Sequence, residues 1–136
     1  MERQKKIIDA NIGVKWFAKE DGSDSARSIL KDHIEEHTIL CVPELFVYEL
    51  TNALRYKKTT VDQLKAIVHE LFDFQLEYIP ITEMIMEKAA ELSFHYQLTI
   101  YDAVYLALAE TLNARLITTD EKIMNTKHPL LAALPL

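Results

Sequence analysis

Four acidic residues lie beside apolar segments at well-separated places along the chain, a setting in which carboxylates can do chemistry. They are Asp9, Glu49, Asp102 and Asp120. Like charges that are gathered together repel unless a cation neutralises them. Hard divalent cations such as Mg²⁺ and Mn²⁺ prefer oxygen ligands, and Mg²⁺ also binds substrate phosphates. If folding brings the four acids together, they predict a metal site that activates water for attack on a phosphodiester.

Asp102 lies at the start of the most apolar part of the chain. Residues 103–109, which follow it, are all apolar, and a helix that is apolar on every side is a buried helix. An unpaired carboxylate at such a place is costly and needs a hydrogen-bonded partner or a metal. Thr99 and Asp102 also fit a capping box, in which the acid bonds the backbone of the cap. Considered alone, Asp102 favours this structural role.

Glu49 interrupts a second apolar segment, residues 45–50, which we expect to be helical. Asn52 follows three residues later, so the two side chains form one polar stripe on the predicted helix. In a helix that is buried on most sides, this stripe would face a polar site. The alternative is the exposed face of an ordinary surface helix, because Thr51 and Arg55 show that part of this helix meets water.

Short apolar segments rich in β-branched residues predict strands, and helical periodicity predicts helices between them. The predicted strands are residues 5–9, 38–42, 77–81 and 115–118, and residues 130–136 could add an edge strand. The predicted helices are residues 11–19, 24–37, 44–57, 61–72, 83–96 and 100–112, with Pro43 at the first position of the third. Thr60, Thr82 and Thr99 are the expected N-caps, and Asn113 is an expected left-handed stop.

Strands that alternate with helices indicate crossover connections and a parallel α/β sheet covered on both faces. Such sheets bind ligands outside the carboxyl ends of their strands, where the strand order reverses. Asp9 ends the first predicted strand, and Asp120 follows the fourth. If these two strands are neighbours, both acids line one crevice.

The composition indicates one globular domain over residues 1–136. About half of the residues are apolar, and the chain holds only two glycines and four prolines. The single cysteine, Cys41, favours a reducing compartment, and no apolar segment is long enough to span a bilayer, so we expect a soluble cytoplasmic protein. A net charge of −6 argues against a broad basic surface for nucleic acid, although cations bound by the acids would reverse the local field.

His33 and His37 match the H-x-x-E-H pattern of one class of zinc proteases. The predicted helix is short, its other face supplies core residues, and no residue makes a specific case as the third zinc ligand. We therefore expect a solvated helix end there.

Two aromatic pairs have the residue types of a base-stacking platform. They are Tyr101 with Tyr105, and Trp16 with Phe17. Aromatic residues at helical spacing beside apolar neighbours are more often part of the core, and we expect these four to pack there.

The order and spacing of the acid-bearing segments resemble those of PIN-domain ribonucleases, in particular the VapC-like toxins of prokaryotic toxin–antitoxin pairs. The matching segments read IIDANIGVKWF, VPELFVYELTNAL, LTIYDAVYLALA and LITTD, and they lie between about residues 6 and 123. A single such motif would be weak, but four in one order are specific.

The resemblance implies a three-layer α/β/α sandwich on a parallel sheet of four to five strands, and an endoribonuclease that uses Mg²⁺ or Mn²⁺. It also implies a homodimer and a small antitoxin whose tail covers the site. By position, it assigns catalysis and metal binding to four carboxylates, Asp9, Glu49, Asp102 and Asp120. It gives supporting roles to Asn11 and Thr118, and we add Asn52 for its place beside Glu49. Glu121 leaves open which of two adjacent carboxylates faces the metal.

Two other functions fit part of the sequence. In a non-catalytic PIN-like interaction module, the acids would only cap helices and satisfy buried backbone. A signalling receiver domain is also a parallel α/β fold with acids at strand ends, but it needs an adjacent acid pair after the first strand. Here residues 9–11 read Asp-Ala-Asn, and Lys122 is poorly placed for the lysine that such a domain carries near the end of a late strand.

Overall fold

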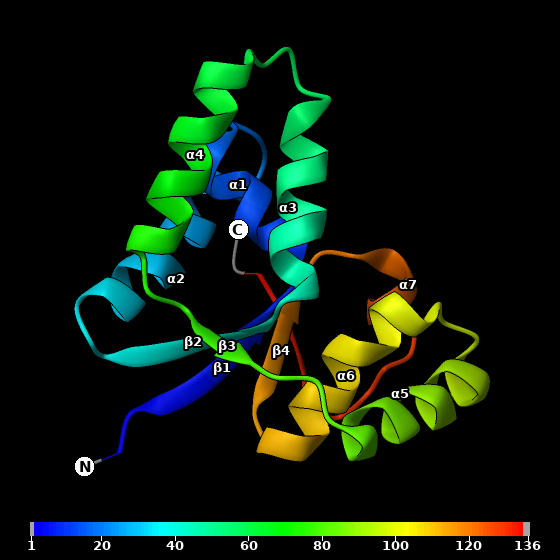
Figure 1. Ribbon diagram of the computed structural model, residues 1–136. Coiled ribbons are helices and arrows are strands. Elements are labelled where there is room, and N and C mark those ends of the chain that lie inside the picture. Colours follow the sequence, from blue (N-terminus) through cyan, green and yellow to red (C-terminus); the bar gives the residue numbers. More distant parts are fainter. Residues whose placement is uncertain (1, 135–136) are drawn as a thin grey trace.

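The computed structural model describes residues 2–134 and contains a five-stranded parallel sheet (Figure 1). The strands are β1 (Gln4–Ile8), β2 (Thr38–Pro43), β3 (Glu77–Ile79), β4 (Arg115–Thr118) and β5 (Leu131–Ala133). They lie in the order β3-β2-β1-β4-β5, and all four neighbouring pairs are parallel. The first and fourth strands are therefore neighbours, and the strand order reverses at β1.

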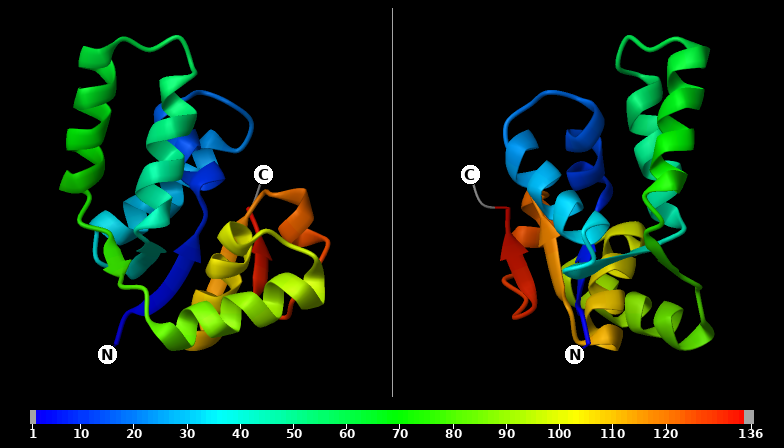
Figure 2. Two further views of the ribbon diagram at one scale, coloured as in Figure 1. Left: turned by 45° about the vertical axis from the view of Figure 1, so that its right-hand side comes forward. Right: turned by 90° about the vertical axis from the view of Figure 1, so that its left-hand side faces the viewer.

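Helices cover both faces of the sheet. They are α1 (Ala10–Phe17), α2 (Ser23–Ile34), α3 (Leu45–Arg55), α4 (Val61–Asp73), α5 (Glu83–Tyr96), α6 (Ile100–Leu112) and α7 (Glu121–Met124). Helices α1 to α4 share one core with one face of the sheet, whereas α5 and α6 share a second core with the other face (Figures 1 and 2). The predicted three-layer α/β/α sandwich is confirmed. Within residues 2–134, no helix is both long and apolar enough to cross a membrane.

Alternation along the strands divides the apolar side chains between the two cores, because successive side chains of a strand point to opposite faces. Ile7 and Leu116 pack with α5 and α6, whereas their neighbours Ile8 and Ile117 pack with α1 to α4. The central strands are thus buried on both faces, as is usual for parallel sheets.

Helix α6 is the buried helix that its sequence predicts. Residues 103–109 are all buried. Thr99 caps the helix, because its hydroxyl oxygen accepts a hydrogen bond from the Asp102 backbone N–H at 3.1 Å. Asn113 ends it in the left-handed conformation, with φ of 48°. Both ends of α6 are therefore fixed by local sequence, and Asp102 is held in the first turn.

Helices α1 and α3 pack closely because residue 13 is a glycine. A Cβ atom at Gly13 would lie 2.6 Å from Cζ of Phe46 and 3.3 Å from Cδ2 of Leu50, both of which belong to α3. The missing side chain lets α1, which follows Asp9, approach the helix that carries Glu49.

Two predicted helix boundaries are wrong. Pro43 is the last residue of β2, paired with Ile79, and does not begin α3. Because a proline has no backbone N–H for the next sheet hydrogen bond, β2 ends at this residue. Helix α2 ends at Ile34 and does not reach His37, because Glu36 adopts a left-handed conformation, with φ of 63°, that a right-handed helix does not accommodate.

The predicted third and fifth strands are longer than the observed ones. Strand β3 ends at Ile79, directly before Pro80, which has no N–H for a sheet hydrogen bond. Strand β5 is the predicted edge strand and comprises Leu131–Ala133, while residues 135 and 136 of the prediction lie outside the described residues.

Some of the side chains that the sequence predicts in the core are exposed. Trp16 and Tyr105 lie in the core as expected, but Tyr101 is 61 % exposed, contrary to the prediction. On α4, Leu71 is buried and Phe72 is 54 % exposed. Helix α4 stands beside α3 at the outside of the molecule (Figure 2), so a narrower stripe of it is covered than its apolar sequence predicts.

Candidate active site

A small polar cavity of about 100 Å³ lies beyond the carboxyl ends of β1 and β4. Its lining residues are Asp9, Ala10, Asn11, Glu49, Asp102, Tyr105 and Asp120. All four predicted acids are among them, although they come from four separate parts of the chain. The fold therefore brings together the carboxylates that the sequence singled out, at the place where the strand order reverses.

Asp9 is the most enclosed of the four acids. It follows β1 directly and is the N-cap of α1, with only 4 % of its surface exposed. Its Oδ1 accepts a hydrogen bond from the Ile12 backbone N–H at 3.3 Å, and its Oδ2 accepts one from the Thr118 hydroxyl. Burial raises the pKa of Asp9 to about 6, against these hydrogen bonds, and the nearby charges of Asp120 and Glu49 raise it further.

Thr118 connects the ends of β1 and β4. Its buried hydroxyl donates to Asp9 and accepts a hydrogen bond from the Asp120 backbone N–H at 2.9 Å. Asp120 in turn caps α7, because its Oδ1 accepts from the Ile123 backbone N–H at 3.0 Å. Glu121 is exposed and is not among the lining residues, so the geometry favours Asp120 as the acid that faces the cavity.

Glu49 reaches the cavity from α3 and is partly buried. Its Oε1 accepts a hydrogen bond from the Tyr105 hydroxyl at 2.6 Å. Burial raises the pKa of Glu49, and the charges of Asp102 and Asp120 add to the rise, whereas the bond from Tyr105 opposes it. Of the two side chains in the predicted polar stripe on α3, Glu49 therefore lines a polar cavity.

Asp102 lines the cavity from the first turn of α6. Burial raises its pKa, and the charge of Asp120 contributes in the same direction. The Thr99 hydroxyl accepts a hydrogen bond from the Asp102 backbone N–H. This is only the half of the predicted capping box that Thr99 supplies, because among the described residues the Asp102 carboxylate does not bond the Thr99 N–H. The pKa is thus raised at three of the acids, Asp9, Glu49 and Asp102, because burial and neighbouring carboxylates both disfavour ionisation.

The donor set fits a hard divalent cation. Carboxylate, amide and phenol groups line the cavity, with neither thiol nor imidazole, and oxygen donors suit Mg²⁺ or Mn²⁺. Across residues 2–134, however, no three histidine, cysteine or acidic side chains converge tightly enough to form a ready metal centre.

Asn11, Asn52 and Thr118 occupy different places. Asn11 lies at the exposed rim of the cavity, and Thr118 is buried behind Asp9. Asn52 is exposed on α3 and lines a separate shallow hollow with Tyr48 and Arg55. The structure therefore brings two of the three close to the acids, and the supporting roles of all three stay predictions.

Tyr105 is a polar lining residue that the sequence did not assign to the site. Its ring is in the core, as expected, but its hydroxyl group reaches the cavity and bonds Glu49. The usable signal was its spacing, since Tyr105 lies three residues after Asp102 and hence on the same side of the helix.

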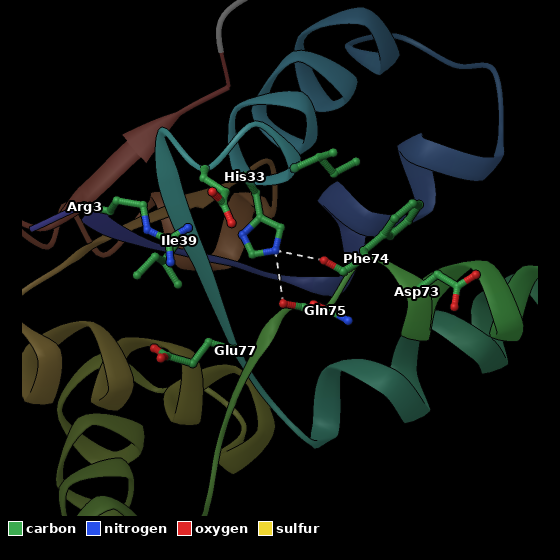
Figure 3. A pocket seen from close by; sticks show the side chains of 9 residues that line it. Arg3, His33, Ile39, Asp73, Phe74, Gln75 and Glu77 are labelled. Carbon is green, nitrogen blue, oxygen red and sulfur yellow. Dashed lines mark hydrogen bonds between the residues drawn. The ribbon is translucent and has the colours of Figure 1, made fainter.

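A larger hollow, of about 420 Å³, lies at the opposite ends of the strands and is lined in part by His33 (Figure 3). The imidazole accepts a hydrogen bond from the Leu40 N–H at 3.0 Å, and its other nitrogen lies 3.0 Å and 3.2 Å from the carbonyl oxygens of Phe74 and Gln75. Both ring nitrogens are thus engaged with backbone. The expectation of a solvated helix end is correct for the exposed His37 and wrong for His33, which joins α2 to the segment before β3.

Known proteins are similar to this chain in sequence and in fold. The family described as PIN domain matches residues 6–129. Ribonuclease VapC3 of Pyrobaculum aerophilum is 29 % identical over 133 residues, which cover 93 % of this chain and 97 % of that protein.

Two solved structures illustrate the similarity in fold. The crystal structure of VapBC2 from Rickettsia felis, bound to a DNA fragment from its promoter, contains a chain with a TM-score of 0.74 and 18 % identity, covering 97 % of this chain and 100 % of that one. A toxin–antitoxin complex from Klebsiella pneumoniae gives a TM-score of 0.71 and 20 % identity, covering 93 % of this chain and 95 % of the other. At these identities the structures show a common fold.

Proposed function

The chain belongs to the PIN domain family, and on this basis we propose that it is a metal-dependent endoribonuclease that acts as the toxin of a toxin–antitoxin pair. The observation that carries the proposal is the gathering of Asp9, Glu49, Asp102 and Asp120 around one cavity. Similarity to ribonuclease VapC3 over nearly the full length of both proteins supports RNA as the substrate class.

The four carboxylates are the proposed ligands of Mg²⁺ or Mn²⁺. A divalent cation held there would supply activation of water for in-line attack on phosphorus and stabilisation of the leaving oxygen. Thr118 and the N–H of Ile12 hold the Asp9 carboxylate in place. Asp102 is anchored by the buried helix behind it.

The proposed roles of the two asparagines differ. The amide of Asn11, at the cavity rim, is placed to bond a phosphate or ribose of bound RNA. Asn52 lies one turn beyond Glu49 on the exposed side of α3, where it would contact RNA outside the cavity.

The proposed partners are a small antitoxin protein and a second copy of the chain. The similar Klebsiella pneumoniae structure is a toxin–antitoxin complex, which supports an antitoxin partner here. Light scattering of the purified chain, alone and with the product of a small reading frame immediately upstream of its gene, tests both associations.

Cleavage of defined tRNA and rRNA substrates tests the activity. We expect cleavage with Mg²⁺ or Mn²⁺ and none with EDTA. Asp9→Asn and Asp102→Asn should each lower the rate by more than about 100-fold, beyond the usual effect of losing an outer partner of a metal ligand. Asp62→Asn, at an exposed acid in α4, is the matched control and should cleave normally. Cleavage that persists in EDTA contradicts the proposal.

A non-catalytic interaction module is the second candidate, because Asp9 and Asp120 both cap helices. In that case the acids would have only structural roles. Isothermal titration separates the two functions, since the module predicts no Mn²⁺ binding at millimolar concentration by the folded protein, whereas the nuclease predicts saturable binding.

A further inference from the structure

A hydrogen bond between side chains joins the two helical layers at the cavity. Tyr105 belongs to α6, and Glu49 belongs to α3 on the other side of the sheet (Figure 1). The Tyr105 hydroxyl donates to Oε1 of Glu49 at 2.6 Å, although the two residues are 56 positions apart. This bond therefore spans the space in which the proposed metal and RNA phosphate would lie.

The position of the Tyr105 hydroxyl is fixed by packing. The side chain is 1 % exposed, and its ring lies in the core formed by α5, α6 and the sheet. A buried hydroxyl needs a hydrogen-bond partner, because an unpaired one keeps the full cost of leaving water. The buried ring thus holds the hydroxyl at a fixed place beside the Glu49 carboxylate, which is only partly buried.

Glu49 depends on this donor more than the other enclosed acids do on theirs. Asp9 and Asp120 each accept a backbone N–H of the helix that they cap. Among the described residues, Tyr105 is the hydrogen-bond donor recorded for the Glu49 carboxylate. Oε1 is engaged by Tyr105, and among the described residues no hydrogen bond to Oε2 is found.

We propose that Tyr105 is a positioning residue that orients the Glu49 carboxylate as a metal ligand and holds the two helical layers at a fixed separation across the cavity. The inference rests on the proposed metal-dependent function. Partners of this kind, which fix a ligand without touching the metal, typically change metal affinity by about 10–100-fold when they are removed.

Tyr105→Phe tests the role, because it keeps the buried ring and removes only the hydroxyl group. Titration calorimetry should show Mn²⁺ affinity about 10–100-fold lower than in the wild type. RNA cleavage should fall at low Mn²⁺ and recover towards the wild-type rate at saturating Mn²⁺. Tyr101→Phe, one turn earlier on α6 and exposed, is the matched control and should change neither property.

Thermal unfolding in EDTA separates positioning from simple packing. We expect Tyr105→Phe to unfold within a few degrees of the wild type, so that its lower Mn²⁺ affinity belongs to the folded protein. Unchanged Mn²⁺ affinity in Tyr105→Phe, with wild-type protein that binds Mn²⁺ and cleaves RNA, overturns the positioning role and leaves the nuclease intact. A wild-type protein that binds no Mn²⁺ overturns both.

Discussion

The carboxyl group of Asp9 is nearly inaccessible to water and lies beside two further acids of the cavity. Its pKa is raised from 3.8 to about 6, so the folded protein holds this proton more tightly than the unfolded chain does. Its contribution to stability is therefore complete below about pH 4 and is lost as the pH rises through about 6. A rise of about two pKa units corresponds to about 3 kcal/mol.

Asp9→Asn should therefore stabilise the metal-free protein at neutral pH. An amide of the same shape removes the cost of the buried charge but gives up one of two accepted hydrogen bonds, so we expect a net gain on the order of 1–2 kcal/mol at pH 7.5. Urea denaturation in EDTA at pH 4.5 and 7.5 measures it, and the gain should be smaller at pH 4.5.

The exposed Asp62→Asn serves as the control for this prediction and should show little difference between the two pH values. If Asp9→Asn were less stable than the wild type at pH 7.5 in EDTA, the electrostatic description of the cavity would be wrong. If the prediction holds, Asp9→Asn combines higher stability of the metal-free protein with lost activity, as is common for substitutions in functional sites.

The four acids of the cavity could be selected from the sequence, but Tyr105 could not. Asp9, Glu49, Asp102 and Asp120 could be selected because charged groups beside apolar segments are unusual. Tyr105 could not be recognised in the same way, because a tyrosine suits the core and its hydroxyl becomes important only through a partner 56 positions away.

At the level of elements, the N-caps link local sequence to the site. Thr60 and Thr99 both cap helices, and the Thr60 cap is a complete capping box with Gln63. Such boundaries are predictable because the cap and the helix that it opens are neighbours in sequence. Two other boundaries were not predicted. Glu36 closes α2 in a left-handed Schellman motif, in which the His37 N–H bonds the Asp32 carbonyl, although glycine is the usual residue there. Pro43 pairs with Ile79 of β3, a contact between distant parts of the chain.

Thr99→Ala and Thr60→Ala should destabilise the protein by similar amounts, about 1 kcal/mol each, because each removes one N-cap. Their effects on metal binding should differ, since the Thr99 hydroxyl holds the backbone of Asp102. We expect Mn²⁺ affinity to fall several-fold in Thr99→Ala and to stay unchanged in Thr60→Ala. Equal affinities in calorimetry would show that the cap does not position the acid.

Gly13→Ala tests the close packing of α1 against α3. The new methyl group would lie 2.6 Å from the fully buried ring of Phe46. Overpacking typically costs about 1–3 kcal/mol, and the better helix propensity of alanine offsets about 1 kcal/mol of it. We therefore expect a net loss of up to about 2 kcal/mol in urea denaturation.

Phe46→Leu provides the matched background for this test, because it removes the ring atoms that the new methyl group would meet. In that background, Gly13→Ala should cost less than it does in the wild type. An equal cost in both backgrounds would mean that the contact between α1 and α3 is not the reason for the glycine.

In the whole molecule, the sheet topology brings together acids that are far apart in sequence. Apolar strands alternating with helices were enough to predict a parallel sheet with helices on both faces. They were not enough to place β1 beside β4, since the strand order depends on packing across the entire chain. The expectation that Asp9 and Asp120 meet therefore depended on the order of four motifs rather than on any one of them.

The separation of the two helical layers is equally a property of the whole fold. Helices α1 to α4 deliver Glu49 and Asn11 from one side, α6 delivers Asp102 and Tyr105 from the other, and the ends of β1 and β4 lie between. Local sequence explains each helix, but the cavity of about 100 Å³ exists only because both layers are docked on one sheet.

The central claim is that these carboxylates hold a divalent cation, and crystals soaked in Mn²⁺ test it most directly. We predict an anomalous difference peak in the cavity between Asp9, Glu49, Asp102 and Asp120, with carboxylate oxygens at roughly 2.0–2.2 Å, the distance usual for small hard cations. The peak should be lost in crystals of Asp102→Asn. No peak in the cavity at millimolar Mn²⁺, or a peak that persists unchanged in Asp102→Asn, would contradict the account.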